Sequence, residues 1–246
     1  MLNLNGKVAL ITGSARGIGK ATALMLASYG ADIIVNDRCV SSESESTTDE
    51  VRSKGCKAEF IAADVTDVTA VKRLYDESIR LFGKVDILVN NAGIALSNTM
   101  MNISEEDWDK VIDVNLKGIF NTCKLFSPSM MERNWGRIIN ISSIAGRRGS
   151  IFGDVHYSSA KAGVIGFTKC LAKICGPHNV TVNAIAPGIV KTQILSEEHE
   201  AASIANIPLG RTAVPDEIAS VILFYVSAMS DYVTGTVLDV NGGSYM

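Results

Sequence analysis

The chain has 246 residues, 47% of them hydrophobic, with a formal net charge of −3 and a pI near 5.7. This length allows one or two domains, and the mild acidity offers no basic surface of the kind that nucleic-acid-binding proteins carry. No apolar run reaches the roughly 18 residues of a membrane-spanning helix, and the N-terminal residues lack the apolar segment of a signal peptide. We therefore expect a cytoplasmic protein that binds neither nucleic acid nor membrane.

The first predicted element is a short buried strand, residues 8–11, which leads into a glycine-rich turn and a helix that stops at Gly30. Strand, turn and helix in this order present backbone N–H groups and a helix N-terminus to a pyrophosphate. Glycine is needed because the turn requires unusual φ angles and the backbone must approach the phosphates closely. The spacing is G-x-x-x-G-x-G, which differs from the best-known dinucleotide fingerprint. The expected cofactor-binding residues here are Gly13, Ser14, Arg16, Gly17, Ile18 and Gly19.

A second apolar run, residues 33–35, ends at an acid, Asp37, eighteen residues after Gly19. A carboxylate at the end of the second strand accepts hydrogen bonds from the adenosine ribose hydroxyls and repels a 2′-phosphate, which favours NAD(H). Arg16 and Arg38 point the other way because either could pair with that phosphate, so NADP(H) stays possible. Judged alone, Asp37 is equally well explained as a cap of the next helix.

Strand-like and helix-like segments alternate from Val8 to Val240 without a Pro/Gly/Ser-rich linker. This alternation predicts one α/β domain, residues 1–246, with a Rossmann-type doubly wound parallel sheet. The serine- and acid-rich stretch 41–50 is interpreted as a turn leading into a polar helix. The three histidines and five cysteines show no metal-ligand spacing, so we expect no metal site and mostly packed, reduced thiols.

The most informative stretch is Tyr157-Ser158-Ser159-Ala160-Lys161, fourteen residues after Ser143. On a helix, Tyr157 and Lys161 project from the same face one turn apart. A lysine ammonium there would favour the phenolate and lower the pKa of the tyrosine toward the range of a general acid/base. A nearby serine hydroxyl could hold a substrate oxygen. By itself, such a pair is more typical of a surface helix.

Together these motifs resemble the short-chain dehydrogenase/reductase family over essentially the whole chain. The resemblance implies that Tyr157 is the acid/base, that Lys161 lowers its pKa and binds the nicotinamide ribose, and that Ser143 positions the substrate oxygen. Ser142 is the rival for the serine role, and the Ser-x-x-Gly match with Gly146 favours Ser143. Asn115 would hold a backbone kink and a water; it could instead simply cap or bend its own helix. The family pattern adds these cofactor residues: Asp64, Val65, Asn91, Ala92, Gly93, Tyr157, Lys161, Pro187, Gly188, Val190 and Thr192.

The substrate is less well defined by the sequence than the reaction. The expected activity is hydride transfer between a nicotinamide cofactor and a carbonyl or secondary alcohol, with residues 193–207 as a small lid over the substrate. The lid length and the C-terminal ending are most similar to 3-oxoacyl-acyl-carrier-protein reductases. Those enzymes usually take NADPH, and some have basic residues for the carrier protein near positions held here by Asn134 and His178. A dehydrogenase of a small polyol, sugar acid, hydroxyacyl thioester or steroid alcohol is nearly as well supported.

Two further expectations follow from the resemblance. Family members that bind dinucleotides without redox chemistry usually lose the tyrosine or lysine, so a sensor role is a minor alternative. The helices around Asn115 and Tyr157 carry apolar residues on more than one face, for example Ile112, Phe120 and Phe167. In the family these helices form a dimer interface, and the C-terminal strand forms another. We therefore expect a homotetramer, although central helices of one large domain would show the same pattern.

Overall fold

The structure is a computed structural model that describes residues 2–150, 154–191 and 204–246. A seven-stranded sheet runs through the molecule, all its paired strands are parallel, and the strand order is β3-β2-β1-β4-β5-β6-β7. The predicted doubly wound parallel sheet is confirmed. The strands are β1 (Val8–Thr12), β2 (Asp32–Asp37), β3 (Ala58–Ala62), β4 (Ile87–Asn90), β5 (Gly136–Ile141), β6 (Val180–Pro187) and β7 (Val237–Val240).

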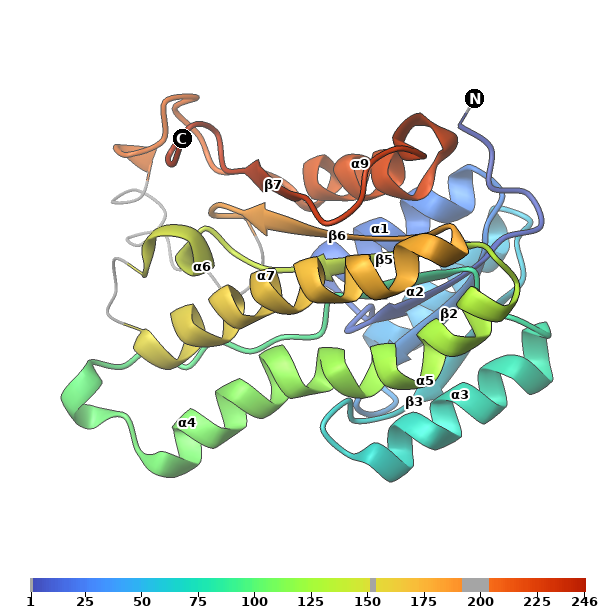
Figure 1. The fold of residues 1–246 in the computed structure, drawn as a ribbon, viewed down its shortest axis with the longest axis horizontal. Coiled ribbons are helices and arrows are strands. Elements are labelled where there is room, and N and C mark those ends of the chain that lie inside the picture. The colour runs from blue at the N-terminus through green and yellow to red at the C-terminus, as the bar shows by residue number, and fades with distance from the viewer. Residues whose placement is uncertain (1, 151–153, 192–203) are drawn as a thin grey trace.

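Helices cover both faces of this sheet (Figure 1). Helices α1, α2 and α9 contribute side chains to one core, whereas α3, α5 and α7 contribute to the other. A π-helical segment, Asp113–Lys117, joins α4 to α5. The helices are α1 (Gly17–Ser28), α2 (Ser42–Ser53), α3 (Val68–Phe82), α4 (Glu105–Ile112), α5 (Gly118–Glu132), α6 (Ala145–Arg148), α7 (Val155–Cys175) and α9 (Pro215–Val226).

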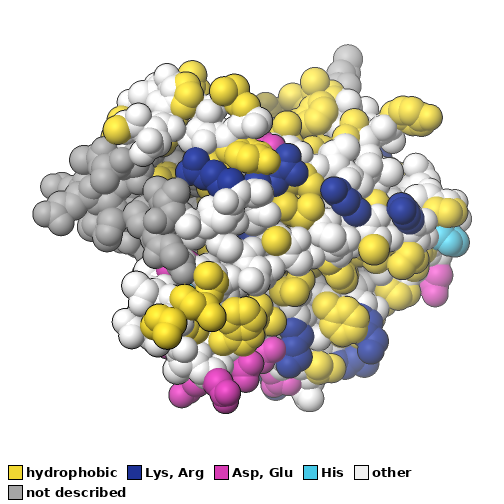
Figure 2. All heavy atoms as spheres, turned by 60° about the vertical axis from the view of Figure 1, so that its left-hand side comes forward, with side chains coloured by type: hydrophobic (Ala, Val, Ile, Leu, Met, Phe, Trp, Pro, Cys, Tyr) yellow, Lys and Arg dark blue, Asp and Glu magenta, His cyan; other side chains and the backbone are white. Residues whose placement is uncertain are grey.

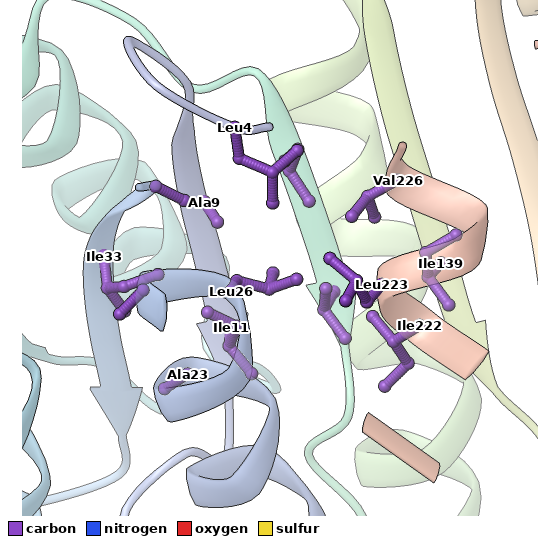
Figure 3. Packing of buried hydrophobic residues seen from close by; sticks show 14 of the residues in the cluster. Leu4, Ala9, Ile11, Ala23, Leu26, Ile33, Ile139, Ile222, Leu223 and Val226 are labelled. Carbon is purple, nitrogen blue, oxygen red and sulfur yellow. The ribbon is translucent and has the colours of Figure 1, made fainter. Parts of the chain in front are cut away.

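The strands are apolar on both sides because both faces are covered. Successive side chains of a strand point to opposite faces, so Ala9 and Ile11 belong to the α1/α9 core while Val8 and Leu10 belong to the other. Figure 3 shows the first of these cores, in which the side chains of α1 lie against those of β1 and β2, and the side chains of α9 lie beside Ile139 of β5. This double packing holds the sheet as a rigid platform whose strand ends carry the loops.

The strand order places a switch point between β1 and β4. From β1 the chain moves outward to β2 and β3, then returns to the other side of β1 as β4. The connections that follow β1 and β4 therefore leave in opposite directions, which opens a crevice at the carboxyl end of the sheet, the usual ligand position in such folds. Within the described residues, no helix combines the length and apolarity that crossing a membrane requires.

Candidate cofactor and active site

The turn between β1 and α1 can be built only with glycine at key positions. Gly13 and Gly17 have φ angles of +63° and +57°, a region that side chains disfavour. A Cβ on Gly19 would lie 2.3 Å from the carbonyl oxygen of Gly13, so α1 starts in direct contact with the turn. The helix has no side-chain cap and no acid in its first turn, unlike α2, which Ser41 caps. Its first N–H groups are thus free of side-chain competitors for an anion.

Polar side chains from neighbouring strands fix this turn. The side-chain amide of Asn91 donates to the carbonyls of Thr12 and Gly13 at 3.0 and 2.9 Å. The hydroxyl of Thr12 accepts the backbone N–H groups of Asn91 and Ala92, both at 3.0 Å. Ser14 donates its hydroxyl to the carbonyl of Ile11 and accepts the N–H of a β2 residue, so its side chain ties strands together. The sequence alone does not indicate this role of Thr12, because only the β1–β4 pairing brings it to Asn91.

The predicted adenosine-binding residues lie at the ends of β2 and β3. Asp37 closes β2, is partly buried, and accepts the N–H of Arg38 at 2.8 Å. Asp64 follows β3 and accepts the N–H and hydroxyl of Thr66 at 2.9 and 2.7 Å. Val65 is buried, and its side chain occupies the space that a Cβ on Gly118 would need. The first three strands thus present their predicted site residues at one edge of the sheet.

The other side of the crevice is built by β4, β5 and β6. Pro187 ends β6, and Gly188 approaches Asn241 so closely that a Cβ there would lie 2.8 Å from the Asn241 Cα. Val190 forms a parallel bridge with Ala213. Thr192 and most of the expected lid, 193–207, lie outside the described residues.

Helix α7 carries both Tyr157 and Lys161, as predicted. The ammonium nitrogen of Lys161 lies 5.7 Å from the centre of the Tyr157 ring and donates to the carbonyl of Ile141 at 2.8 Å. Two neighbouring serines at the end of β5 have different partners. Ser142 is buried and donates its hydroxyl to the Lys161 carbonyl at 2.8 Å, whereas the Ser143 side chain lies near enough to Tyr157 to lower the pKa of its phenol. The geometry therefore favours Ser143 over Ser142 as the group that faces a substrate oxygen.

Burial dominates the electrostatics of this pair. Desolvation lowers the pKa of Lys161 to about 8, since burial disfavours the ammonium. Desolvation also raises the pKa of Tyr157, with a smaller upward contribution from Asp154, and the Ser143 hydrogen bond opposes it. The sequence predicts that Lys161 lowers the pKa of Tyr157. The structure differs: the net direction is upward, because burial of the phenol outweighs the contribution of Ser143.

Asn115 occupies the π-helical segment, where the helix departs from regular α geometry. Its side-chain amide donates to the carbonyls of Ile94 and Val111 at 2.8 and 2.9 Å. Its oxygen Oδ1 is buried and has no hydrogen-bond partner. A Cβ on Gly93 would lie 2.8 Å from this oxygen and 3.5 Å from the Lys161 ammonium, so glycine keeps open a small polar space between them. An unpaired buried acceptor is costly, which is typical of a site that binds a further group.

The C-terminal tail, residues 241–246, contacts α6 at the end of the molecule that faces the viewer in Figure 2. Arg147 on α6 forms an ion pair with Asp239 at 3.0 Å and stacks on Tyr245 at 5.5 Å. Arg148 donates to the carbonyl of Ser244 at 2.8 Å. These arginines are thus already engaged by the tail. In the described part of the chain no group of three or more His, Cys, Asp or Glu is arranged to hold a metal, and all five thiols are free, with Cys39 and Cys170 exposed.

The residues present fit a dinucleotide. The uncapped start of α1 offers backbone donors to a pyrophosphate, Asp37 stands at the ribose end, and Gly93 leaves space beside the unpaired Asn115 oxygen. Tyr157 and Lys161 on α7 and Ser143, two residues after the end of β5, lie at the same carboxyl edge of the sheet. This fold and site define a dinucleotide-dependent oxidoreductase.

Comparison with known proteins identifies the family. The family model for short chain dehydrogenases matches residues 7–203. The 3-oxoacyl-[acyl-carrier-protein] reductase FabG of Thermotoga maritima is 43% identical over 246 residues, which covers 98% of this chain and 99% of that protein. The enzyme of the same name from Aquifex aeolicus is 42% identical and covers 99% of both chains. A short-chain type dehydrogenase/reductase from Mycobacterium marinum superposes with a TM-score of 0.95 at 34% identity, covering 99% of this chain and 97% of that one. The chain belongs to the short-chain dehydrogenase family and is an NAD(P)-dependent oxidoreductase that acts on carbonyl or CH–OH groups.

Proposed function

We propose that Tyr157, Ser143, Lys161 and Asn115 form the catalytic group for this reaction. The observation that carries the proposal is the buried Lys161 ammonium 5.7 Å from the Tyr157 ring, with the Ser143 side chain near enough to the phenol to lower its pKa. The bound nicotinamide cofactor supplies or accepts the hydride. In reduction, the Tyr157 hydroxyl donates its proton to the carbonyl oxygen, and in oxidation the phenolate takes the proton of the alcohol. Ser143 holds that oxygen within reach.

Lys161 and Asn115 act around the tyrosine. The buried ammonium of Lys161 stabilises negative charge that develops on the phenol during proton transfer, and it faces the cofactor ribose position. The unpaired Asn115 oxygen is the acceptor for a water that returns protons toward Lys161. The remaining cofactor contacts come from the β1–α1 turn, the ends of β2 and β3, and the loops after β4 and β6, with Thr192 included.

NAD(H) is the preferred cofactor in this proposal. Asp37 ends β2 at the position of the adenosine ribose and would repel a 2′-phosphate. The first turn of α2 adds two more acids, Glu43 and Glu45, and its N-terminus is already capped by Ser41. Arg16 and Arg38 are the residues that would favour NADP(H). Arg16 lies near Glu43 and makes the last and smallest contribution to the lowered pKa of that carboxyl, after a backbone hydrogen bond and two serines.

The substrate class that we propose first is a 3-oxoacyl thioester, reduced to the 3-hydroxyacyl thioester. The support is the 41–43% identity to proteins named 3-oxoacyl-[acyl-carrier-protein] reductase over nearly the whole chain. The second candidate is an NAD-dependent catabolic dehydrogenase of a small polyol, sugar acid or steroid alcohol, which the acid at Asp37 favours. A non-catalytic dinucleotide sensor is a minor third, opposed by the presence of the complete Asn-Ser-Tyr-Lys group.

We further propose a cytoplasmic homotetramer with the segment 193–207 as a lid over the substrate. Exposed apolar side chains on α4, α5 and α7 support the assembly. Trp108, Phe120 and Ile174 are 39%, 46% and 61% exposed, and a second copy of the chain would cover them. Light scattering that shows a monomer near 26 kDa would overturn the assembly.

The function is tested with the purified protein and two substrate sets. A 3-oxoacyl thioester with each reduced cofactor is compared with polyols, sugar acids and steroid alcohols with each oxidised cofactor. We expect turnover of the thioester, with higher kcat/KM for NADH than for NADPH. Turnover of an alcohol alone would support the catabolic dehydrogenase, and cofactor binding without any turnover would support the sensor.

A further inference from the structure

A chain of buried polar side chains runs beneath the active site from α5 to α7. The Thr122 hydroxyl donates to the oxygen of Asn90 at 2.7 Å, and the Asn90 amide donates to the oxygen of Asn140 at 2.8 Å. The Asn140 amide then donates to the hydroxyl of Thr168 at 2.9 Å. All four residues are at most 2% exposed. The two asparagines are register partners on β4 and β5, so their side chains leave the sheet on the same face.

The chain ends on the same helix that carries Tyr157 and Lys161. Thr168 lies seven residues after Lys161, two turns of α7 along nearly the same face. Three consecutive residues, the last two of β5 and Ser142 directly after it, each hold this helix. Asn140 bonds Thr168, the Ile141 carbonyl accepts the Lys161 ammonium, and the Ser142 hydroxyl donates to the Lys161 carbonyl. Helix α7 is therefore hydrogen-bonded to the end of β5 at two positions along its axis, at Lys161 and at Thr168.

Such bonds fix position better than they add stability. A pair of apolar side chains of the same shape would pack here with similar stability, because the polar groups must first be desolvated. Unlike apolar contacts, hydrogen bonds between an amide and a hydroxyl tolerate little sliding of the helix along the strand. Displacements near 1 Å at a reacting group cost on the order of 10²-fold in rate.

We propose that Asn140 and Thr168 are positioning residues that fix where α7 lies along its axis relative to the end of β5. Through the helix they fix the positions of Tyr157 and Lys161. Neither residue touches the substrate or cofactor. They act through the helix, with Ser142 holding its other attachment point. The inference rests on the proposed catalytic roles of Tyr157 and Lys161.

The test compares two isosteric substitutions on different helices. Thr168→Val removes the hydroxyl at the end of the chain. The matched control is Thr48→Val on α2. Thr48 is also buried and, like Thr168, donates its hydroxyl to the carbonyl four residues earlier, but among the residues that the structure describes this hydroxyl bonds only within its own helix. We expect Thr168→Val to lower kcat about 10-fold or more, to shift the pH profile of kcat, and to leave the dissociation constant of the cofactor within about 2-fold. Thr48→Val should match the unsubstituted protein, and Thr168→Ser should restore kcat and the pH profile.

Two outcomes would overturn the inference. One is a kcat and pH profile of Thr168→Val that match those of Thr48→Val. The other is a Thr168→Ser variant as impaired as Thr168→Val, which would assign the effect to packing of the lost methyl group. If Thr168→Val does not fold, the doubly apolar variant Asn140→Leu/Thr168→Val removes the bond without leaving the Asn140 amide unpaired, and the Asn90 amide keeps the Cys123 sulfur as a partner. Normal kcat in that variant refutes the role. Tyr157→Phe is assayed alongside: if it retains full turnover, the proposed catalytic group fails, whatever Thr168 shows.

Discussion

Replacing Lys161 with methionine separates the electrostatic cost of the buried ammonium from its use in catalysis. Methionine has a similar length, is neutral, and adapts to irregular cavities. Lys161 is 4% exposed, and desolvation lowers its pKa from 10.5 to about 8. The folded protein therefore holds this proton less tightly than the unfolded chain does.

The sign and the size of the effect follow from this difference. Between pH 8 and 10.5 the unfolded chain keeps a proton that the folded protein has lost, so the free energy of unfolding rises with pH. At about 1.4 kcal/mol per pH unit, the full contribution is about 3 kcal/mol, fully present as a penalty well below pH 8. The methionine variant lacks this dependence. It also loses the bond to the Ile141 carbonyl, a cost that does not change with pH.

The assay is urea unfolding of both proteins at equal concentration from pH 7 to pH 10. We expect the stability of the unsubstituted protein minus that of Lys161→Met to increase by about 2 to 3 kcal/mol over this range. A difference that stays constant with pH would show that burial does not lower the lysine pKa. A difference that decreases would show that a partner raises it. In either case the electrostatic description of the site would be wrong.

Three further predictions concern single residues. Asp37→Ser should lower the preference for NADH over NADPH by about 10-fold or more, because the carboxylate no longer repels a 2′-phosphate. Equilibrium titration with both cofactors measures this preference. An unchanged ratio of the two dissociation constants would show that Asp37 does not set the cofactor specificity. Ser143→Ala should lower kcat by about 10²-fold or more with cofactor affinity retained. Ser142→Ala should lower kcat by a smaller factor, because the Ser142 hydroxyl bonds only the backbone of α7. Steady-state kinetics that reverse this order would exchange the roles of the two serines. Gly19→Ala should destabilise the fold by about 1 to 3 kcal/mol and weaken cofactor binding, because its Cβ would meet the Gly13 carbonyl. Gly166→Ala on α7, with open space around its Cβ, is the control and should be neutral or slightly stabilising; equal losses in both would point to a general intolerance of added volume.

The sequence predicted what depends on local patterns. The apolar run before Gly13 and the glycine spacing specify strand, turn and helix, since the turn angles are a local requirement. The four-residue spacing of Tyr157 and Lys161 placed them on one face of α7. The doubly wound parallel sheet followed from the alternation of elements and from the family resemblance.

The sequence could not reveal bonds that depend on strand register. Thr12 meets Asn91 across 79 residues, and Asn90 meets Asn140 across 50, only because β1, β4 and β5 pair at particular positions. The sequence also could not predict the direction in which the pKa of Tyr157 shifts, because burial of a side chain is a property of the packed molecule. The spacing in the sequence identified Lys161 as the charged neighbour of Tyr157, but it did not reveal that both side chains are desolvated.

The most direct test of the central claim is the turnover of Tyr157→Phe. Phenylalanine keeps the ring and removes only the hydroxyl that donates and accepts the proton. The account predicts loss of thioester reduction by a factor of about 10² or more, with the dissociation constant of the reduced cofactor unchanged within about 2-fold. Reduction at the unsubstituted rate by Tyr157→Phe would contradict the assignment of the acid/base, and with it the mechanism proposed for this protein.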